Sequence, residues 1–569
     1  MCVHPRDNNS RHIGNRPHDQ TRIVENRQTS DVSDTPHAPA ADLAFGAFSD
    51  QPPWILDRSG SSWTDVAIEL RAAAQHEVPT LTRRRAIPPL RRLVVVVYQL
   101  GRAITPWYLR RRGFLWMKSF ETPEESRADL SRRLRIAIEK LGATYIKLAQ
   151  IISSGEGLFP EELVGEFKKC RDQVPAESFS DVLRTVERDL GARLSDVFST
   201  FDTIPLAAAS IAQVHRATLR TGEDVVVKVQ RPSVSERVRE DLKVMSWIAP
   251  LMIGRIPVAA LANPPALVEL FAETIVEELD FRMEAANMVD VATMLRELAQ
   301  DGYVVPRPHP DLVAKRVLVM ERLEGFNFDD VAGMQNAGID TEAVIRTGMI
   351  AFMEGALIRG VFHGDLHGGN LFVMADGRTA LLDYGIVGRL SDMRRLAFLK
   401  LMLAATTNDL RGQVAALRDL GALPLDTVID DVIVDLRLAE PIDPTTLSGE
   451  ELVKEVQRVV KSLLAYGAKL PKELMLYVKN MVFLDGAIAR LAPDLDLLAE
   501  VANITIVFTQ RHGERLGKEL GIDPTAVEFN FDSVKASLGV DVATNSLTYR
   551  ELQKRRELIQ RRMRDYVVS

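Results

Sequence analysis

Two carboxylates and one amide in the second half of the chain form a pattern that metal-assisted chemistry could use. Asp365 and Asn370 are five residues apart in the run His363-Gly-Asp-Leu-His-Gly-Gly-Asn370, and Asp383 follows Asn370 by thirteen residues. Carboxylate and amide oxygens are ligands for Mg²⁺, which absorbs the charge that develops on a γ-phosphoryl group during its transfer from ATP. We therefore predict that Asn370 and Asp383 bind the metal ion and that Asp365 orients the phosphoryl acceptor.

A lysine that follows three valines lies upstream of these residues. Lys228 stands in a predicted strand, in the place from which a kinase lysine contacts the α- and β-phosphates of ATP. A buried lysine needs an acidic partner, and the helix predicted from about Pro264 to Leu295 carries several acids, of which Glu284 fits the ion pair best. The order of Lys228, Glu284, Asp365 and Asp383 predicts a protein-kinase-like ATP site in which the first three are catalytic residues.

The segment before Lys228 lacks the glycine-rich loop that covers phosphates in ordinary kinases. Small residues stand in its place, namely Ala207, Ala208, Ala209 and Ser210. An alanine adds a methyl group and narrows the backbone conformations that glycine would allow near a phosphate. We expect these residues to contact the nucleotide in an altered pose. The alternative is a turn that merely prefers small residues.

The catalytic-loop pattern also contains two histidines. We expect His363 to orient the loop, while His367 occupies the place where many kinases carry a lysine. These roles do not predict a zinc site at the histidines.

The strands and helices predicted around these residues indicate an α+β fold. We expect it to be protein-kinase-like, with two lobes. Strands around 210–219 and 224–230 form a predicted hairpin, and a further strand covers 317–320. The residues at and after the end of that strand are expected to contact the nucleotide, namely Met320, Glu321 and Leu323. From 332 to 511 the pattern is mostly helical, with two short strands around 371–373 and 379–382.

The chain divides into six predicted regions. They are a disordered tail (1–60), a basic and aromatic helical segment suited to membrane contact (61–125), a helical element (126–200), a kinase-like N-lobe (201–330), a largely helical C-lobe (331–511) and a C-terminal helical tail (512–569).

Composition limits the function classes. A net charge of −7 gives no general attraction to polyanions, so we expect no nucleic-acid partner. Only two cysteines occur, which predicts a reducing compartment without structural disulfides. No apolar run is long enough to span a bilayer, and the polar N-terminus does not resemble a signal peptide.

One segment carries a strong positive charge, although the net charge of the whole chain is small and negative. From Arg83 to Lys118 there are ten basic residues and no acidic one, interleaved with aliphatic and aromatic side chains. Such a mixture suits an anionic membrane surface. The alternative is a basic helical face that packs against an acidic part of the same protein.

Five segments together resemble the UbiB/ADCK family of atypical kinases. They are Lys147-Leu-Ala-Gln150, Ala207 to Ser210, Glu278-Leu-Asp280, His363 to Asn370 and Asp383-Tyr-Gly385. The resemblance covers about residues 125–400. It implies a kinase-like fold with an inserted helical element whose Lys-x-Gly-Gln signature lies over the active site.

The resemblance carries specific expectations for this inserted element. Lys147 and Gln150 would occlude the site, and Glu278 and Asp280 would meet the element, while Glu284 pairs with Lys228. Ala149 replaces the glycine of the signature.

The preferred hypothesis is an ATP-binding, Mg²⁺-dependent atypical kinase or ATPase of the UbiB/ADCK type. The resemblance implies support of isoprenoid quinone biosynthesis or lipid homeostasis, with a quinone precursor or lipid, an anionic membrane surface and biosynthetic-complex proteins as partners. We expect a cytoplasmic protein, peripheral on the inner face of a membrane. Two alternatives are a small-molecule phosphotransferase similar to aminoglycoside and choline kinases, and a non-catalytic scaffold that senses ATP.

Overall fold

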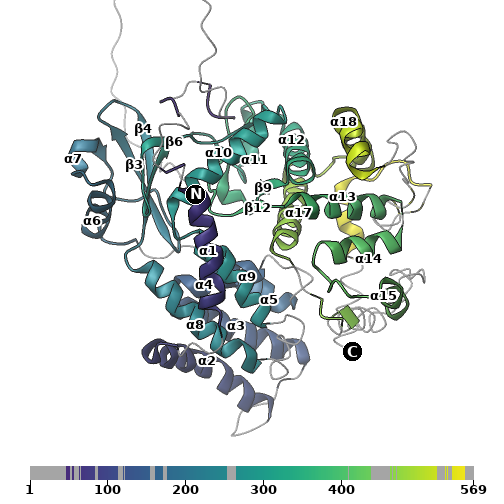
Figure 1. The fold of residues 1–569 in the computed structure, drawn as a ribbon, viewed down its shortest axis with the longest axis horizontal. Helices are drawn as coiled ribbons and strands as arrows, with labels where there is room; N and C mark the ends of the chain where they lie inside the picture. The colour runs from purple at the N-terminus through teal and green to yellow at the C-terminus, as the bar shows by residue number, and fades with distance from the viewer. Residues whose placement is uncertain are drawn as a thin grey trace, which may run out of the picture.

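The computed structural model describes residues 47–557 apart from gaps, of which the longest are 113–119, 253–263, 437–461 and 522–531. A six-stranded sheet forms the N-lobe, in the order β1-β3-β4-β7-β6 with β2 beside β3 (Figure 1). Its strands are β1 (Phe198–Phe201), β2 (Ala207–Ala208), β3 (Ala212–Leu219), β4 (Asp224–Gln230), β6 (Pro308–Val313) and β7 (Val317–Glu321). The predicted hairpin is present as β3 and β4, which pair in an antiparallel register.

Different helices bury the two faces of this sheet. Alternate residues of a strand point to opposite faces, so the three valines Val225, Val227 and Val229 of β4 face one side, where they pack with α6 (Phe179–Leu190). Lys228 points to the other side, which is covered by α10 (Phe281–Glu297). Figure 1 shows α6 and α10 on opposite sides of the sheet.

The N-lobe begins earlier in the chain than the predicted boundary at 201. The helix α6 packs on the sheet, the short helix α7 (Leu194–Val197) follows it, and β1 pairs with β3. The sequence pattern of α6 and α7 is helical, so it did not distinguish helices that cover the sheet from those of the preceding helical element.

The single helix predicted over 264–295 is two helices. The first is α9 (Pro264–Glu277), and α10 begins after a break at Glu278–Asp280. Asp280 caps α10, because its side chain accepts a hydrogen bond from the Arg282 backbone N–H at 3.2 Å. The break turns α10 against the sheet and leaves Glu278 in a connection that faces the site.

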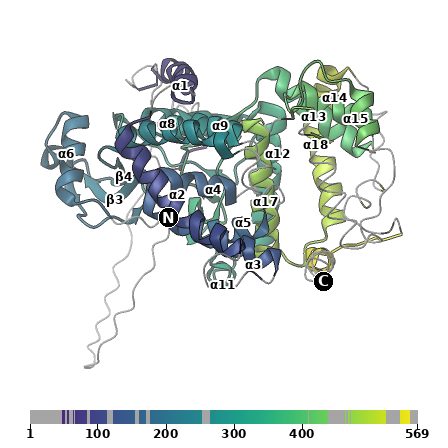
Figure 2. The same cartoon turned by 90° about the horizontal axis from the view of Figure 1, so that it is seen from below.

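A helical layer carries its own hydrophobic core beside the lobes. Its members are α1 (Ala67–Leu81), α2 (Leu90–Arg111), α3 (Pro123–Leu141), α4 (Ala143–Ser153), α5 (Glu161–Phe167), α8 (Val234–Met252) and α9. The predicted helical element begins with α3 and α4, which are separated at Gly142, whose φ of 98° favours glycine. Figure 2 shows α1 on one side of α8 and α9, with α4 on the other.

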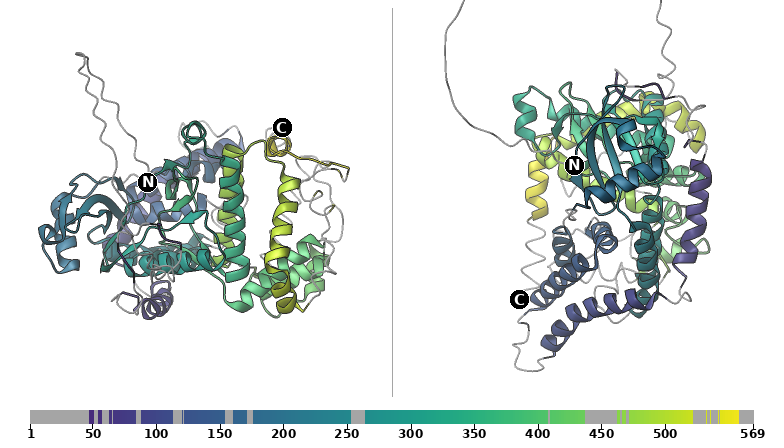
Figure 3. Two further views of the ribbon diagram at one scale, coloured as in Figure 1. Left: turned by 90° about the horizontal axis from the view of Figure 1, so that it is seen from above. Right: turned by 90° about the vertical axis from the view of Figure 1, so that its left-hand side faces the viewer.

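The basic segment, predicted for membrane contact or for internal packing, packs in part against other helices of the protein. Arg92 of α2 donates to the fully buried Asp241 of α8 at 2.5 Å, and Arg110 pairs with Glu125 at 2.6 Å. Other side chains of α2 remain exposed, and Figures 1 and 3 place this helix at the edge of the molecule away from the sheet. Arg84, Arg85 and Lys118 lie outside the described residues.

The C-lobe is largely helical, as predicted. Its helices are α11 (Val331–Asn336), α12 (Thr341–Glu354), a π-helical turn (Gly355–Arg359), α13 (Asp392–Thr406), α14 (Leu410–Asp419), α15 (Ile429–Asp435), α17 (Lys472–Leu491) and α18 (Leu497–Leu520). The main hydrophobic core joins α10 to α12, α13 and α17, so the two lobes share one core.

Short strands carry the functional loops of the C-lobe. The two predicted strands are β10 (Leu371–Val373) and β11 (Thr379–Leu381), which pair with β8 (Phe326–Asn327) and β5 (Tyr303–Val304) respectively as well as with each other. The sequence did not predict β5 or β8, nor β9 (Val361–His363) and β12 (Val387–Arg389), which pair with each other and bracket the site.

Two predicted regions extend outside the described part of the chain, namely the N-terminal tail at 1–46 and the end of the C-terminal helical tail after 557. Among the described helices, none has both the length and the apolar character needed to cross a bilayer.

Candidate active site

Lys228 lies at the centre of a buried ion network between the lobes. Its Nζ donates to Glu284 Oε1 at 2.6 Å and to Asp383 Oδ2 at 3.2 Å, and its side chain is 9% exposed. Burial alone would lower the pKa of Lys228, but the charges of Asp383 and Glu284 outweigh burial and raise it. The structure thus contains the predicted ion pair between Lys228 and Glu284. The raised pKa keeps Lys228 protonated beside Asp383.

The catalytic loop is built around His363, which bridges its two halves. The Asp365 backbone N–H donates to His363 Nδ1 at 3.1 Å, while His363 Nε2 hydrogen-bonds the Asp383 carbonyl. The Asn370 side-chain nitrogen donates to the Asp365 carbonyl at 3.0 Å, so the amide oxygen is the end that remains for a ligand. These contacts bring Asp365, Asn370 and Asp383 together, as their spacing predicted.

Asp383 is the most accessible acid of this group. Its side chain is 32% exposed, and its Oδ1 accepts the Gly385 backbone N–H at 2.9 Å. A Cβ at position 385 would lie 3.3 Å from the Glu278 side chain and 3.2 Å from Asp383 Oδ1, so the glycine permits this close approach. Burial alone would raise the pKa of Asp383, but Lys228 and Lys147 hold it well below its usual range, so the group stays ionised.

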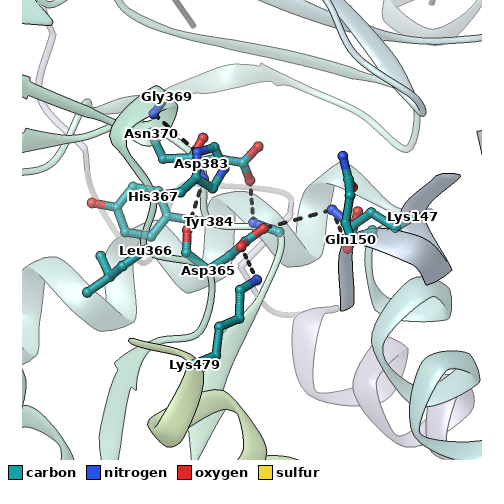
Figure 4. Close-up of polar contacts among 12 residues, drawn as sticks. Lys147, Gln150, Asp365, Leu366, His367, Gly369, Asn370, Asp383, Tyr384 and Lys479 are labelled. Carbon is teal, nitrogen blue, oxygen red and sulfur yellow. Dashed lines mark hydrogen bonds and ion pairs between the residues drawn. The ribbon is translucent and has the colours of Figure 1, made fainter. Parts of the chain in front are cut away.

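Asp365 lies between two lysines that come from different parts of the chain (Figure 4). Lys479 of α17 donates to Asp365 Oδ1, and Lys147 of α4 lies 3.9 Å from Asp365 Oδ2. Burial alone would raise the pKa of Asp365, but these two charges outweigh it and hold the pKa far below the usual value. Asp365 is therefore a carboxylate that can accept hydrogen bonds and is a poor proton acceptor in this arrangement.

Sequence reasoning missed two residues of α17. Besides Lys479, the fully buried Asn480 accepts the Leu366 backbone N–H at 3.1 Å through Oδ1 and donates to the His363 carbonyl through Nδ2. These bonds fasten α17 to both sides of Asp365. The available signal was the Lys-Asn pair, which interrupts an otherwise apolar run over 474–484.

The inserted helical element contacts the site through Lys147, as the resemblance implied. Lys147 Nζ lies 3.1 Å from Glu278 Oε1, and the neighbouring Gln150 is half-buried on the same helix, as Figure 4 shows. Ala149 is completely buried in the core of the helical layer. Its methyl group thus has room in the place of the signature glycine.

Within the described part of this element no residue pairs with Asp280, contrary to the expectation. Besides capping α10, it forms an ion pair with Arg282 at 2.7 Å. Its neighbour Glu278 is the acid that reaches Lys147, and burial raises the pKa of Glu278 to about 7, helped by Asp383 and Asp365 and opposed by Lys147.

The alanine-rich loop lies in register with Lys228. Ala207 pairs with Val214, which pairs with Lys228 on the next strand. The loop is fixed by a hydrogen bond from the Ala209 N–H to the Ala212 carbonyl at 2.8 Å and by Arg231, whose Nε donates to the Ala209 carbonyl at 2.9 Å. Ala208 is half-buried in β2 and Ser210 is buried, so the alanines are the more accessible part of the loop.

The three residues predicted beyond β7 have different environments. Met320 pairs with Val226 and so shares the face of the sheet that carries Lys228. The Glu321 side chain lies on the opposite face, where it accepts the Arg307 backbone N–H at 3.2 Å. Leu323 lines an open pocket of about 580 Å³ with Asp224 and other polar residues. Only Met320 is placed by its side chain on the Lys228 side.

The arrangement fits Mg²⁺ and ATP chemistry. Asn370 and Asp383 present an amide oxygen and an ionised carboxylate, donors that Mg²⁺ accepts when phosphates and water complete its coordination. Among the described residues, no group of three or more His, Cys, Asp or Glu side chains is arranged as an all-protein metal site. A two-residue site is the pattern expected when the metal arrives with the nucleotide.

Comparisons with known proteins identify the family of this chain. A family model described as the ABC1 atypical kinase-like domain matches residues 169–417. The uncharacterized protein Rv0647c of Mycobacterium tuberculosis is 32% identical over 447 residues, which cover 76% of this chain and 90% of that protein. A probable protein kinase UbiB of Azotobacter vinelandii is 32% identical over 417 residues, which cover 71% of this chain and 77% of that protein.

Similar proteins also occur in plants and among solved structures. An uncharacterized chloroplastic aarF domain-containing protein kinase of Arabidopsis thaliana is 30% identical over 404 residues, covering 66% of this chain and 75% of that protein. A solved complex of Rv3197 with erythromycin from Mycobacterium tuberculosis matches 60% of this chain and 90% of its own at 22% identity and a TM-score of 0.35, which is too low to compare the sites. The family match and the coverage of the sequence relatives lead to one conclusion: the chain belongs to the UbiB/ABC1 family of atypical kinase-like proteins.

Proposed function

We propose that this protein is an ATP-binding, Mg²⁺-dependent atypical kinase or ATPase. The observation that carries the proposal is the convergence of the Lys228–Glu284 ion pair with Asp365, Asn370 and Asp383 at one junction between the lobes. The family membership supports a kinase-like phosphotransferase in general.

Each residue has a role that follows from its chemistry. Lys228, held by Glu284, offers an ammonium group to the phosphates. Asn370 and Asp383 would hold Mg²⁺, which supplies neutralisation of phosphate charge when it is bound. Asp365 faces the acceptor and orients it, and its low pKa favours orientation over proton abstraction.

The test is nucleotide binding with and without Mg²⁺ for the wild type and Asp383→Asn, measured by calorimetry. Loss of the metal-facing charge should weaken Mg-ATP binding by roughly tenfold or more while metal-free ATP binds similarly. Glu514→Gln, which removes one exposed carboxylate on α18, is the matched control. Unchanged Mg-ATP affinity in Asp383→Asn would contradict the metal assignment.

We further propose that nucleotide turnover supports isoprenoid quinone biosynthesis or lipid homeostasis at a membrane surface, with a quinone precursor or lipid and biosynthetic-complex proteins as partners. This part rests on the family resemblance and on the exposed face of α2. That face carries apolar side chains beside arginines, namely Leu90, Val94, Val97, Tyr98 and Tyr108 with Arg91, Arg102 and Arg112.

The two alternative functions, a small-molecule phosphotransferase and a non-catalytic ATP sensor, would require different features at the site. A small-molecule phosphotransferase needs an open acceptor site beside Asp365, whereas Lys147 and Lys479 both contact that residue here. A non-catalytic ATP sensor has little need of an ionised Asp365. A phosphorylated hydroxyl compound found in an unbiased substrate screen would favour the first of these functions over the membrane-coupled ATPase.

A further inference from the structure

The catalytic loop has no cation of its own at the position two residues after Asp365. His367 stands there, and its Nδ1 accepts the Gly369 backbone N–H at 3.1 Å, so this ring nitrogen serves to shape the loop. Burial, together with the charges of Lys479 and Lys147, lowers the pKa of His367 below its ordinary value against the opposing effect of Asp365. The imidazole is therefore neutral at neutral pH, and the loop itself offers no positive charge to a phosphate.

Lys479 brings a cation to the same place from another element. Its Nζ donates to Asp365 Oδ1, and its side chain is 16% exposed. The next residue, Asn480, binds the backbone on both sides of Asp365, at His363 and Leu366. Because the helix is fastened to the loop at these two points, the ammonium group of Lys479 is positioned by the fold rather than by Asp365 alone.

The other two lysines of the site have ion-pair partners other than Asp365 at shorter distances. Lys228 is bound to Glu284 and Asp383. Lys147 lies closer to Glu278, at 3.1 Å, than to Asp365, at 3.9 Å, and it belongs to the inserted helical element. Lys479 is the one of these three lysines that belongs to the C-lobe and has Asp365 as its ion-pair partner among the described contacts.

We propose that Lys479 contacts the γ-phosphate of bound ATP and so supplies, from α17, the cation that His367 does not supply from the catalytic loop. This inference rests on the proposed function, because it assumes that the γ-phosphate lies beside Asp365. A lysine ammonium that bridges Asp365 and the phosphate would interact with ATP and not with ADP, which lacks the γ-phosphate.

The experiment compares binding of a non-hydrolysable ATP analogue and of ADP, both with Mg²⁺, by calorimetry. In Lys479→Gln the affinity for the analogue should fall roughly tenfold, the size expected for one charge-assisted hydrogen bond, while ADP affinity stays within about twofold. Lys479→Arg should retain most of the preference for the analogue. Lys472→Gln is the matched control, because this lysine of the same helix pairs with Glu277 outside the network around Asp365.

The double variant His367→Lys/Lys479→Gln tests whether a lysine at position 367 of the catalytic loop can replace the lysine at position 479 of α17. Returning a lysine to the loop should restore the preference for the ATP analogue over ADP. If Lys479→Gln weakens both nucleotides equally, or neither, Lys479 has only a structural role and the inference is wrong. Failure of the wild type to bind either nucleotide is a separate result, which overturns the proposed function and this inference with it.

Discussion

Seven lysine, aspartate and glutamate side chains form the ion network that includes Asp365 within the described part of the chain, and their charges do not balance. Three lysines face four carboxylates, namely Lys147, Lys228 and Lys479 with Glu278, Glu284, Asp365 and Asp383. One bound proton would restore neutrality. Glu278 can hold this proton, because burial and two neighbouring carboxylates raise its pKa from 4.5 to about 7.

The proton on Glu278 predicts a specific pH dependence of stability. A carboxyl group whose pKa is higher in the folded than in the unfolded state stabilises the fold at low pH, and that contribution disappears as the pH rises from about 4.5 to 7. The free-energy change is at most about 3 kcal/mol. In Glu278→Gln the buried charge cannot form, so its melting temperature relative to the wild type should rise between pH 5 and pH 8.

Thermal unfolding of both proteins across this pH range measures the effect. A difference in melting temperature that stays constant from pH 5 to pH 8 would show that Glu278 is ionised throughout, with Lys147 as the stronger influence on its pKa.

At the scale of single residues, sequence spacing predicted which charged groups would meet. The pairing of Lys228 with Glu284 and the grouping of Asp365, Asn370 and Asp383 follow from the strand and loop in which each lies. Lys479 was not predictable in the same way. It lies 114 residues after Asp365, and only the packing of α17 against the loop brings the two together.

The element with the most unusual surface is α2. Its buried side is anchored through Arg92 to Asp241, whereas Leu90 is 74% exposed and Tyr98 is 61% exposed on the other side. Exposed apolar side chains flanked by arginines are the features of helices that lie in the headgroup region of an anionic bilayer. The buried side thus agrees with the packing alternative, and the exposed side is where the proposed membrane contact would occur.

Reversing three exposed charges of α2 tests the membrane proposal. Arg91→Glu/Arg102→Glu/Arg112→Glu should weaken binding to vesicles that contain phosphatidylserine by about 1 kcal/mol for each basic residue near the surface. The measurement is co-sedimentation with anionic and with neutral vesicles.

The control reverses three exposed arginines on the far side of the N-lobe, Arg184, Arg188 and Arg193, with the same change in net charge. Equal losses in both variants would indicate general electrostatics without a role for α2. No loss in the α2 variant would leave this helix without the proposed lipid contact.

The break between α9 and α10 shows where element prediction failed. Apolar periodicity continues from 264 to 295, but Asp280 begins a new helix by capping it. The cap was visible in the sequence as an Asp before a helical run. Its acidic neighbours suggested a polar helix face instead, and the family resemblance placed Asp280 at the inserted element.

Across the whole molecule, three separate units converge on Asp365. The C-lobe supplies its loop and α17, the helical layer supplies Lys147, and the connection between α9 and α10 supplies Glu278. The fold class was predictable because valine-rich strands and long helical stretches have clear periodicities. The packing of α6 on the sheet and the pairing of β9 with β12 depend on contacts that periodicity does not encode.

The central claim is that this convergence transfers or releases the γ-phosphate of ATP. The most direct measurement is single-turnover release or transfer of phosphate from γ-labelled Mg-ATP by the wild type and by Asp365→Asn, with anionic vesicles present. We expect turnover by the wild type and a fall of about 100-fold or more in Asp365→Asn with nucleotide binding retained. Equal rates in the two proteins, or tight binding without turnover in the wild type, would contradict it.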